Sequence, residues 1–154
     1  MSKELQIGIV MGSSSDREIM QKAAEILDEL DIGYEIVVSS AHRNPDQTAQ
    51  YARTAADRGL KVLIAGAGLA AALPGVLAAH TTLPVIGVPI ASGPLNGVDA
   101  LYAIVQMPPG VPVATVGINN ARNAALLSAE ILSLSDEAIR EKLLDYRAQW
   151  NRQG

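Results

Sequence analysis

A histidine and an arginine stand side by side in the stretch Ser39-Ser40-Ala41-His42-Arg43-Asn44-Pro45. Imidazole gains and loses protons near neutral pH, so His42 is a candidate proton carrier. The guanidinium of Arg43 offers several N–H donors in a plane, which suits a phosphate or a carboxylate. A purely structural histidine is the alternative interpretation. The pair indicates proton transfer on an anionic substrate.

A second polar loop, Gly12-Ser13-Ser14-Ser15-Asp16, follows the apolar run 5–11. Backbone N–H groups and hydroxyls at the start of a helix suit a phosphate. Serines also cap helices for structural reasons, and an acid such as Asp16 is favoured in a first helical turn, so both interpretations stay open. The Gly-Lys-Ser/Thr ending of a nucleoside triphosphate loop is missing.

Other candidate motifs are weaker. Gly66-Ala67-Gly68 lacks a third glycine at the spacing of a dinucleotide fingerprint, so it does not predict NAD binding. His80 lies near the end of a short predicted helix, where an imidazole ordinarily meets the last carbonyl groups, and we interpret it as structural. Two histidines without suitably spaced carboxylates predict no metal site.

Short apolar runs alternate with amphipathic segments along the chain, which is typical of a parallel sheet covered on both faces. We therefore predict an α/β fold, a three-layer sandwich with a flavodoxin-like, five-stranded parallel sheet. Ligands bind at the carboxyl ends of such strands, so the two polar loops are expected to face one pocket. The expected strands are 5–11, 34–38, 61–65, 84–90 and 112–116, and the expected helices are 17–30, one from Pro45, 73–80, 97–106 and 119–132.

The composition limits the function classes. Of 154 residues, 49% are hydrophobic and only 3% aromatic, with no phenylalanine, so one aliphatic core is expected. A net charge of −4 without a Lys/Arg cluster argues against nucleic acid as a partner. The chain has no cysteine, and we expect neither a secretion signal nor a membrane segment near its amino terminus, hence a cytoplasmic protein.

A last helix is predicted from Ser135 to about Asn151, beyond the completed sheet. We divide the chain into a flavodoxin-like catalytic domain, 1–134, and a carboxyl-terminal helical arm, 135–154. The apolar positions Ile139, Leu143, Tyr146 and Trp150 form one stripe on an otherwise charged helix. Such a stripe needs a partner surface, either a neighbouring subunit, which we expect, or the same domain.

Several motifs occur in a characteristic order. They are Gly12-Ser13-Ser14-Ser15-Asp16, Ser40-Ala41-His42-Arg43-Asn44-Pro45-Asp46, Ala65-Gly66-Ala67-Gly68, Leu73-Pro74-Gly75, Gly97-Val98-Asp99-Ala100-Leu101-Tyr102 and Ile104-Val105-Gln106-Met107-Pro108. With them the chain resembles the 5-(carboxyamino)imidazole ribonucleotide mutase family of purine biosynthesis over nearly its whole length. Arg43 resembles the bacterial mutase class, because the animal-type carboxylase class usually carries lysine there.

The resemblance implies an isomerase that moves a carboxylate from the exocyclic nitrogen of aminoimidazole ribonucleotide to ring carbon 4. It implies no ATP, metal or organic cofactor, and a homo-octamer. His42 takes the role of proton shuttle between nitrogen and carbon, and the released CO2 is trapped in a closed pocket. The implied substrate-binding residues are Ser13, Asp16 and Arg43, with Ser15, Ser40, Ala41, Ala67, Gly68 and Leu73 lining the rest of the pocket.

Two alternatives remain. A carboxylase using free CO2 and aminoimidazole ribonucleotide would share almost the whole site. A non-enzymatic flavodoxin-like module, such as a receiver domain, would need an acidic cluster after the first strand, which Gly12 to Ser15 does not supply.

The chain departs from the resembled family in one loop. The usual Gly-Gly-Ala-Ala-His-Leu-Pro-Gly is replaced by Gly68-Leu69-Ala70-Ala71-Ala72-Leu73-Pro74-Gly75, with Ala72 in place of the second histidine. A mechanism with two histidines is therefore excluded. Either one imidazole suffices, which we favour because one proton is shuttled, or the chain acts on a related substrate.

Overall fold

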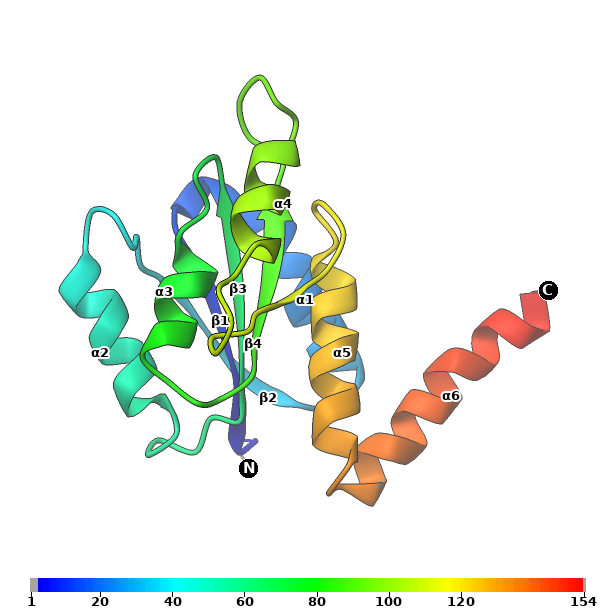
Figure 1. The fold of residues 1–154 in the computed structure, drawn as a ribbon. Helices are drawn as coiled ribbons and strands as arrows, with labels where there is room; N and C mark the ends of the chain where they lie inside the picture. Colours follow the sequence, from blue (N-terminus) through cyan, green and yellow to red (C-terminus); the bar gives the residue numbers. More distant parts are fainter. Residues whose placement is uncertain (1–2, 154) are drawn as a thin grey trace.

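Strands alternate with helices in the computed structural model, which describes residues 3–153 (Figure 1). The strands are β1 (Leu5–Met11), β2 (Gly33–Val38), β3 (Val62–Gly68), β4 (Val85–Ile90) and β5 (Ala114–Thr115). The helices are the short 3₁₀ turn η1 (Ser14–Asp16), α1 (Arg17–Glu29), α2 (Pro45–Ala55), α3 (Leu73–Ala79), α4 (Val98–Val105), α5 (Ala121–Ser133) and α6 (Glu137–Gln153).

The five strands are parallel and lie in the order β2-β1-β3-β4-β5. This is the order of the flavodoxin-like doubly wound fold, and it confirms the predicted fold class. Because all strands run the same way, their carboxyl ends meet at one edge of the sheet. The loops after β2, β1 and β3 are therefore neighbours, although they are far apart in sequence.

The side chains of alternate strand residues contribute to two aliphatic cores, one on each face of the sheet. Ile7, Ile9 and Met11 of β1 point to the side covered by α1 and α5, whereas Val10 points to the side covered by α2, α3 and α4. This alternation follows from the two-residue period of a strand. The helices lie close to the sheet because their buried faces are rich in alanine, for example on α5.

Element ends differ modestly from the prediction. β3 runs on to Gly68, three residues beyond the expected end, because Gly66 to Gly68 continue the register with β4. β5 covers only Ala114 and Thr115 rather than 112–116. Pro112 has no N–H to donate to a sheet, which accounts for the late start of this edge strand.

The last helix has two environments. Ile139 and Leu143 of α6 are buried in the core beside α5, so the first half folds back on its own chain. Arg147 and Glu130 add an exposed ion pair at 3.2 Å. Figure 1 shows α6 diverging from α5 towards the carboxyl terminus, and Trp150 is 58% exposed. Within residues 3–153, no helix combines the length and apolar character needed to cross a membrane.

The packing of α4 on β4 generates a stability prediction. A methyl group on Gly87 would collide with Cγ2 of the buried Ile104, which is attached to a stiff, branched carbon. We expect Gly87→Ala to lower the free energy of unfolding by about 1–3 kcal/mol, as overpacked cores do. Urea unfolding followed by circular dichroism measures this. Gly117→Ala is the matched control, since its nearest neighbour would be 3.8 Å away, and equal stability of both variants would contradict the prediction.

Candidate functional site

The loop after β1 turns at once into a helix. Ser13 caps the 3₁₀ turn, because its Oγ accepts a hydrogen bond from the N–H of Ser15 at 3.3 Å. The hydroxyls of Ser13 and Ser15 are also 2.9 Å apart. Capping, one of the two roles considered for these serines, is therefore present. The loop remains half open, so its hydroxyls are accessible to a ligand as well.

Asp16 is the buried acid of this loop, at 9% exposure. Its N–H donates to the carbonyl of Ser13 at 3.1 Å, and its side chain makes no capping hydrogen bond to α1. Removal from water raises the pKa of the Asp16 carboxyl above its ordinary value, and a hydrogen bond between this carboxyl and the backbone of Ser13 opposes the rise only in part. Such a carboxylate gains by accepting hydrogen bonds from ligand hydroxyls.

The loop after β2 presents His42 and Arg43 to solvent. The hydroxyl of Ser40 accepts a hydrogen bond from the N–H of Arg43 at 3.2 Å, and the N–H of Asn44 donates to the Ser40 carbonyl at 2.8 Å. α2 then starts at Pro45, as predicted, although the side chain of Asn44 does not form the cap. Among the described side chains, no acidic group pairs with Arg43, which leaves the guanidinium free for an anionic ligand.

Backbone hydrogen bonds tie the ends of three strands together. The N–H of Ser39 donates to the Met11 carbonyl at 2.9 Å, and the N–H of Gly12 donates to the Gly66 carbonyl at 3.3 Å. The two polar loops thus leave neighbouring strands at the same level, on one side of the loop after β3. The two loops are therefore neighbours, and that they face one pocket stays a prediction.

Small apolar side chains lie beside the polar loops. Ala67, Ala71 and Leu73, from the end of β3 and the start of α3, are buried, and the partly buried Ala41 packs against the same cluster. Ala41 of the β2 loop thus packs on the same side of the sheet as the end of β3 and the start of α3. Ala72 is partly buried in this segment, at the position where the resembled family has its second histidine.

Two supporting residues were not anticipated. The buried hydroxyl of Thr48 lies 2.7 Å from that of Ser39 and donates to the Asn44 carbonyl at 3.0 Å, which holds the β2 loop against α2. Asn119 accepts a hydrogen bond from the N–H of Ala91 at 2.8 Å and thereby fixes the loop after β4. Of these two residues, only Thr48 could have been identified from the sequence, because it lies four residues after Asn44 at the start of a predicted helix.

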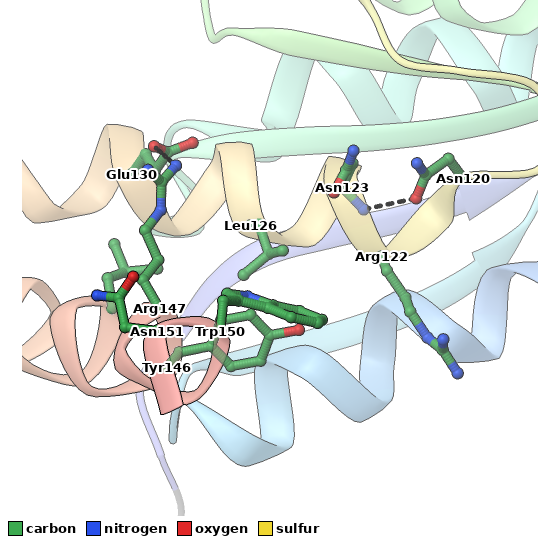
Figure 2. A pocket seen from close by; sticks show the side chains of 10 residues that line it. Asn120, Arg122, Asn123, Leu126, Glu130, Tyr146, Arg147, Trp150 and Asn151 are labelled. Carbon is green, nitrogen blue, oxygen red and sulfur yellow. Dashed lines mark hydrogen bonds and ion pairs between the residues drawn. The ribbon is translucent and has the colours of Figure 1, made fainter. Parts of the chain in front are cut away.

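A cavity of about 700 Å³ lies elsewhere, between α5 and α6 (Figure 2). Leu126, Tyr146 and Trp150 supply apolar surface, and the rings of Tyr146 and Trp150 meet edge to face at 6.4 Å. None of the predicted site residues lines this cavity. It belongs to the diverging half of α6 rather than to the edge of the sheet that carries the polar loops.

The fold is that of a doubly wound α/β protein, with two polar loops side by side at the carboxyl edge of its sheet. Residues 6–153 match a protein-family model described as AIR carboxylase. The chain belongs to this family, which confirms the resemblance inferred from its motifs.

Curated relatives are similar over almost the whole chain. An N5-carboxyaminoimidazole ribonucleotide mutase of Pyrococcus abyssi is 58% identical over 147 residues, or 96% of this chain and 84% of the relative. One of Bacillus subtilis is 59% identical over 143 residues, 92% and 88% of the two chains. A phosphoribosylaminoimidazole carboxylase of Schizosaccharomyces pombe is 61% identical over 127 residues, 82% of this chain and 23% of that longer one.

A solved structure is similar as well. The crystal structure of Treponema denticola PurE matches with a TM-score of 0.87 at 32% sequence identity. The match covers 96% of this chain and 92% of the other. The fold inferred from the pattern of strands and helices is thus shared by a solved member of the same family.

The burial of Asp16 generates a prediction on stability and pH. An acid whose pKa is raised by folding stabilises the protein below its unfolded pKa, and this contribution is lost as pH rises through the folded pKa. An asparagine at position 16 does not ionise, so the Asp16→Asn variant does not lose this stability as the pH rises. We therefore expect the stability of the variant, relative to wild type, to be higher at pH 7 than at pH 3 in urea unfolding. Asp57→Asn, at an exposed position, controls for the lost charge, and the opposite pH trend in Asp16→Asn would contradict the prediction.

Proposed function

We propose that this chain is an isomerase of purine biosynthesis that converts N5-carboxyaminoimidazole ribonucleotide to 4-carboxy-5-aminoimidazole ribonucleotide. The observation that carries the proposal is the location of His42 and Arg43 beside the serine loop, in a chain 58% identical to a relative of that name. A proton carrier and an anion clamp on adjacent strand ends fit a phosphorylated substrate whose reaction moves one proton.

The polar loops divide substrate binding between them. Ser13 and Arg43 bind the phosphate, because a hydroxyl, helix-end N–H groups and a guanidinium all favour an anion. Asp16 accepts hydrogen bonds from the ribose hydroxyls, which offset its burial. The other lining residues are Ser15, Ser40, Ala41, Ala67, Gly68 and Leu73.

The reaction balances with one histidine. The bond between nitrogen and the carboxylate carbon breaks, CO2 leaves, and protonated His42 gives its proton to the exocyclic nitrogen. Carbon 4 of the ring then attacks CO2, and the neutral imidazole takes the proton that carbon 4 loses. His42 ends in its starting state. Retained CO2 reacts at a high effective concentration, which is the main source of rate.

A second imidazole is not needed for this balance. Ala72 occupies the position of the family's second histidine, and its methyl group neither gives nor takes a proton. His42 gives one proton to the exocyclic nitrogen and takes a different one from carbon 4, so a single imidazole returns to its starting state. We therefore assign no acid-base role to the segment between β3 and α3, and no metal or organic cofactor enters the scheme.

A carboxylase is the second candidate function. The relative from Schizosaccharomyces pombe, named phosphoribosylaminoimidazole carboxylase, is 61% identical to this chain. Such an enzyme would take aminoimidazole ribonucleotide and free CO2 into the same site. Only the first half of the reaction, the release of CO2 from nitrogen, would then be absent.

An assay with each substrate separates the two functions. For a mutase, N5-carboxyaminoimidazole ribonucleotide is converted without added bicarbonate, and aminoimidazole ribonucleotide is not carboxylated at low bicarbonate. Chromatography with ultraviolet detection measures both products. Turnover only of aminoimidazole ribonucleotide, rising with bicarbonate, would show a carboxylase, and no turnover of either substrate would contradict both proposals.

The role of His42 gives a sharper prediction. His42→Asn keeps a polar side chain of similar size but cannot titrate, so we expect turnover to fall by at least about 10²-fold while product binding persists. Calorimetric titration with the product nucleotide checks the binding. His80→Asn is the matched control, with activity near wild type. Substantial activity in His42→Asn would remove this residue from the mechanism.

We also propose that the chain acts in the cytoplasm as a homo-oligomer, an octamer by resemblance to the family. The exposed apolar residues support an assembly. Val98, Tyr102 and Val105 recur on one face of α4, each at least 42% exposed. Trp150 adds exposed apolar surface to the diverging half of α6. A second copy of the chain is the occupant that would cover these faces.

A substitution in the diverging half of α6 tests whether this part of the helix takes part in the assembly, and it leaves the buried half unchanged. Trp150→Glu places a charge on the exposed part of the helix, so we expect smaller species in sedimentation velocity. Ala138→Glu, an exposed change on the same helix, is the control. If Trp150→Glu assembled as wild type does, the interface would not include this part of α6.

A further inference from the structure

Gly12, the first residue after β1, has neither of the structural reasons that usually call for a glycine. Its φ lies outside the left-handed region, so the backbone itself does not require a residue without a side chain. A methyl group on its α carbon would have no heavy atom within 4 Å, apart from those of its two neighbours in the chain. Because glycine loses more conformational entropy on folding than alanine does, its presence here has a cost that packing does not explain.

The other described glycines differ from Gly12. A φ between 76° and 102° accounts for four of them, Gly59, Gly93, Gly97 and Gly110. Of the remainder, every one except Gly117 would bring an added methyl group to 3.1 Å or less from another atom. A methyl group on Gly117 would be in ordinary contact, at 3.8 Å. Among the described glycines outside the left-handed region, Gly12 is therefore the one that opens onto free space.

The alternation of β1 directs this open space to one face of the sheet. The N–H of Gly12 still donates to the Gly66 carbonyl, so the ladder with β3 continues through this residue. Two residues earlier, Val10 packs with residues of α2 and α3, and a methyl group on Gly8 would meet the hydroxyl of Tyr51 on α2. By the two-residue period of a strand, a side chain at position 12 would point to this same face.

Small residues flank Gly12 on the two adjacent strand ends. On the β2 side, the hydroxyl of Ser39 lies 2.7 Å from that of the buried Thr48 on α2. On the β3 side, Ala67 adds only a methyl group to the core cluster of this face, and Ala41 of the loop after β2 packs against the same cluster. The ends of three strands thus form a floor of small residues, which we call the Gly12 floor: Ser39, Gly12 and Ala67.

The Gly12 floor lies where the strand order reverses, between β1 and β3, and ligands of open α/β sheets bind at this point. We propose that Gly12 is a specificity-determining residue, and that the open space above its α carbon receives the aminoimidazole base of the ribonucleotide. This inference rests on the proposed function, which assigns the phosphate to Ser13 and Arg43 and the ribose to Asp16. The base is the part of the substrate that still needs a surface, and a flat ring approaches a backbone most closely where no side chain intervenes.

An added methyl group tests this space. Because the backbone at position 12 does not require glycine, Gly12→Ala should have a melting temperature equal to or above that of wild type. Its affinity for the product, 4-carboxy-5-aminoimidazole ribonucleotide, should fall by about tenfold or more in calorimetric titration, since the methyl group occupies part of the space for the base. Ribose 5-phosphate, which has no base, should keep the same dissociation constant in both proteins, measured by competition with the product.

Gly117→Ala is the matched control, because it adds the same methyl group at a glycine with room for it, and both ligands should bind this variant as they bind wild type. The inference fails if Gly12→Ala binds the product as wild type does. It also fails if ribose 5-phosphate and the product lose affinity equally, since the space would then belong to the phosphate or the ribose. A wild-type chain that neither binds nor converts the nucleotide would instead contradict the proposed function, and this inference with it.

Discussion

The geometry of the site depends on two backbone hydrogen bonds at the end of β1. One joins Ser39 to Met11 and the other joins Gly12 to Gly66, so three strand ends are fixed at one level before any loop begins. The candidate site residues are then carried by short segments with fixed starting points. The aliphatic cores on both faces keep those strands in register, which is why a chain without phenylalanine still positions a site.

The candidate site combines rigid supports with exposed polar side chains. Thr48 and Ser39 hold the β2 loop from below, whereas His42 and Arg43 remain open to water. The described residues of one chain therefore hold the candidate site in place without enclosing it.

Much of this arrangement could be predicted from the sequence, because it follows from local patterns. Buried parallel strands are apolar runs, and polar loops at their ends identify one edge of the sheet. Contacts through space could not be predicted. The hydrogen bond from Ala91 to Asn119 joins residues 28 apart. Leu69, just after β3, has a φ of 56°, a left-handed backbone that leucine rarely adopts. The stripe on α6 predicted a partner surface, but only packing shows that Ile139 meets its own chain.

The brevity of β5 limits how the protein can associate. An edge strand of two residues, Ala114 and Thr115, exposes few unpaired backbone groups, and a proline lies just ahead of it. A second sheet has almost no template there for continuing the ladder, so growth into fibrils at this edge is disfavoured. At this edge of the sheet, contacts with another protein would therefore form through side chains, whose shape decides which partner fits, rather than through a continued backbone ladder.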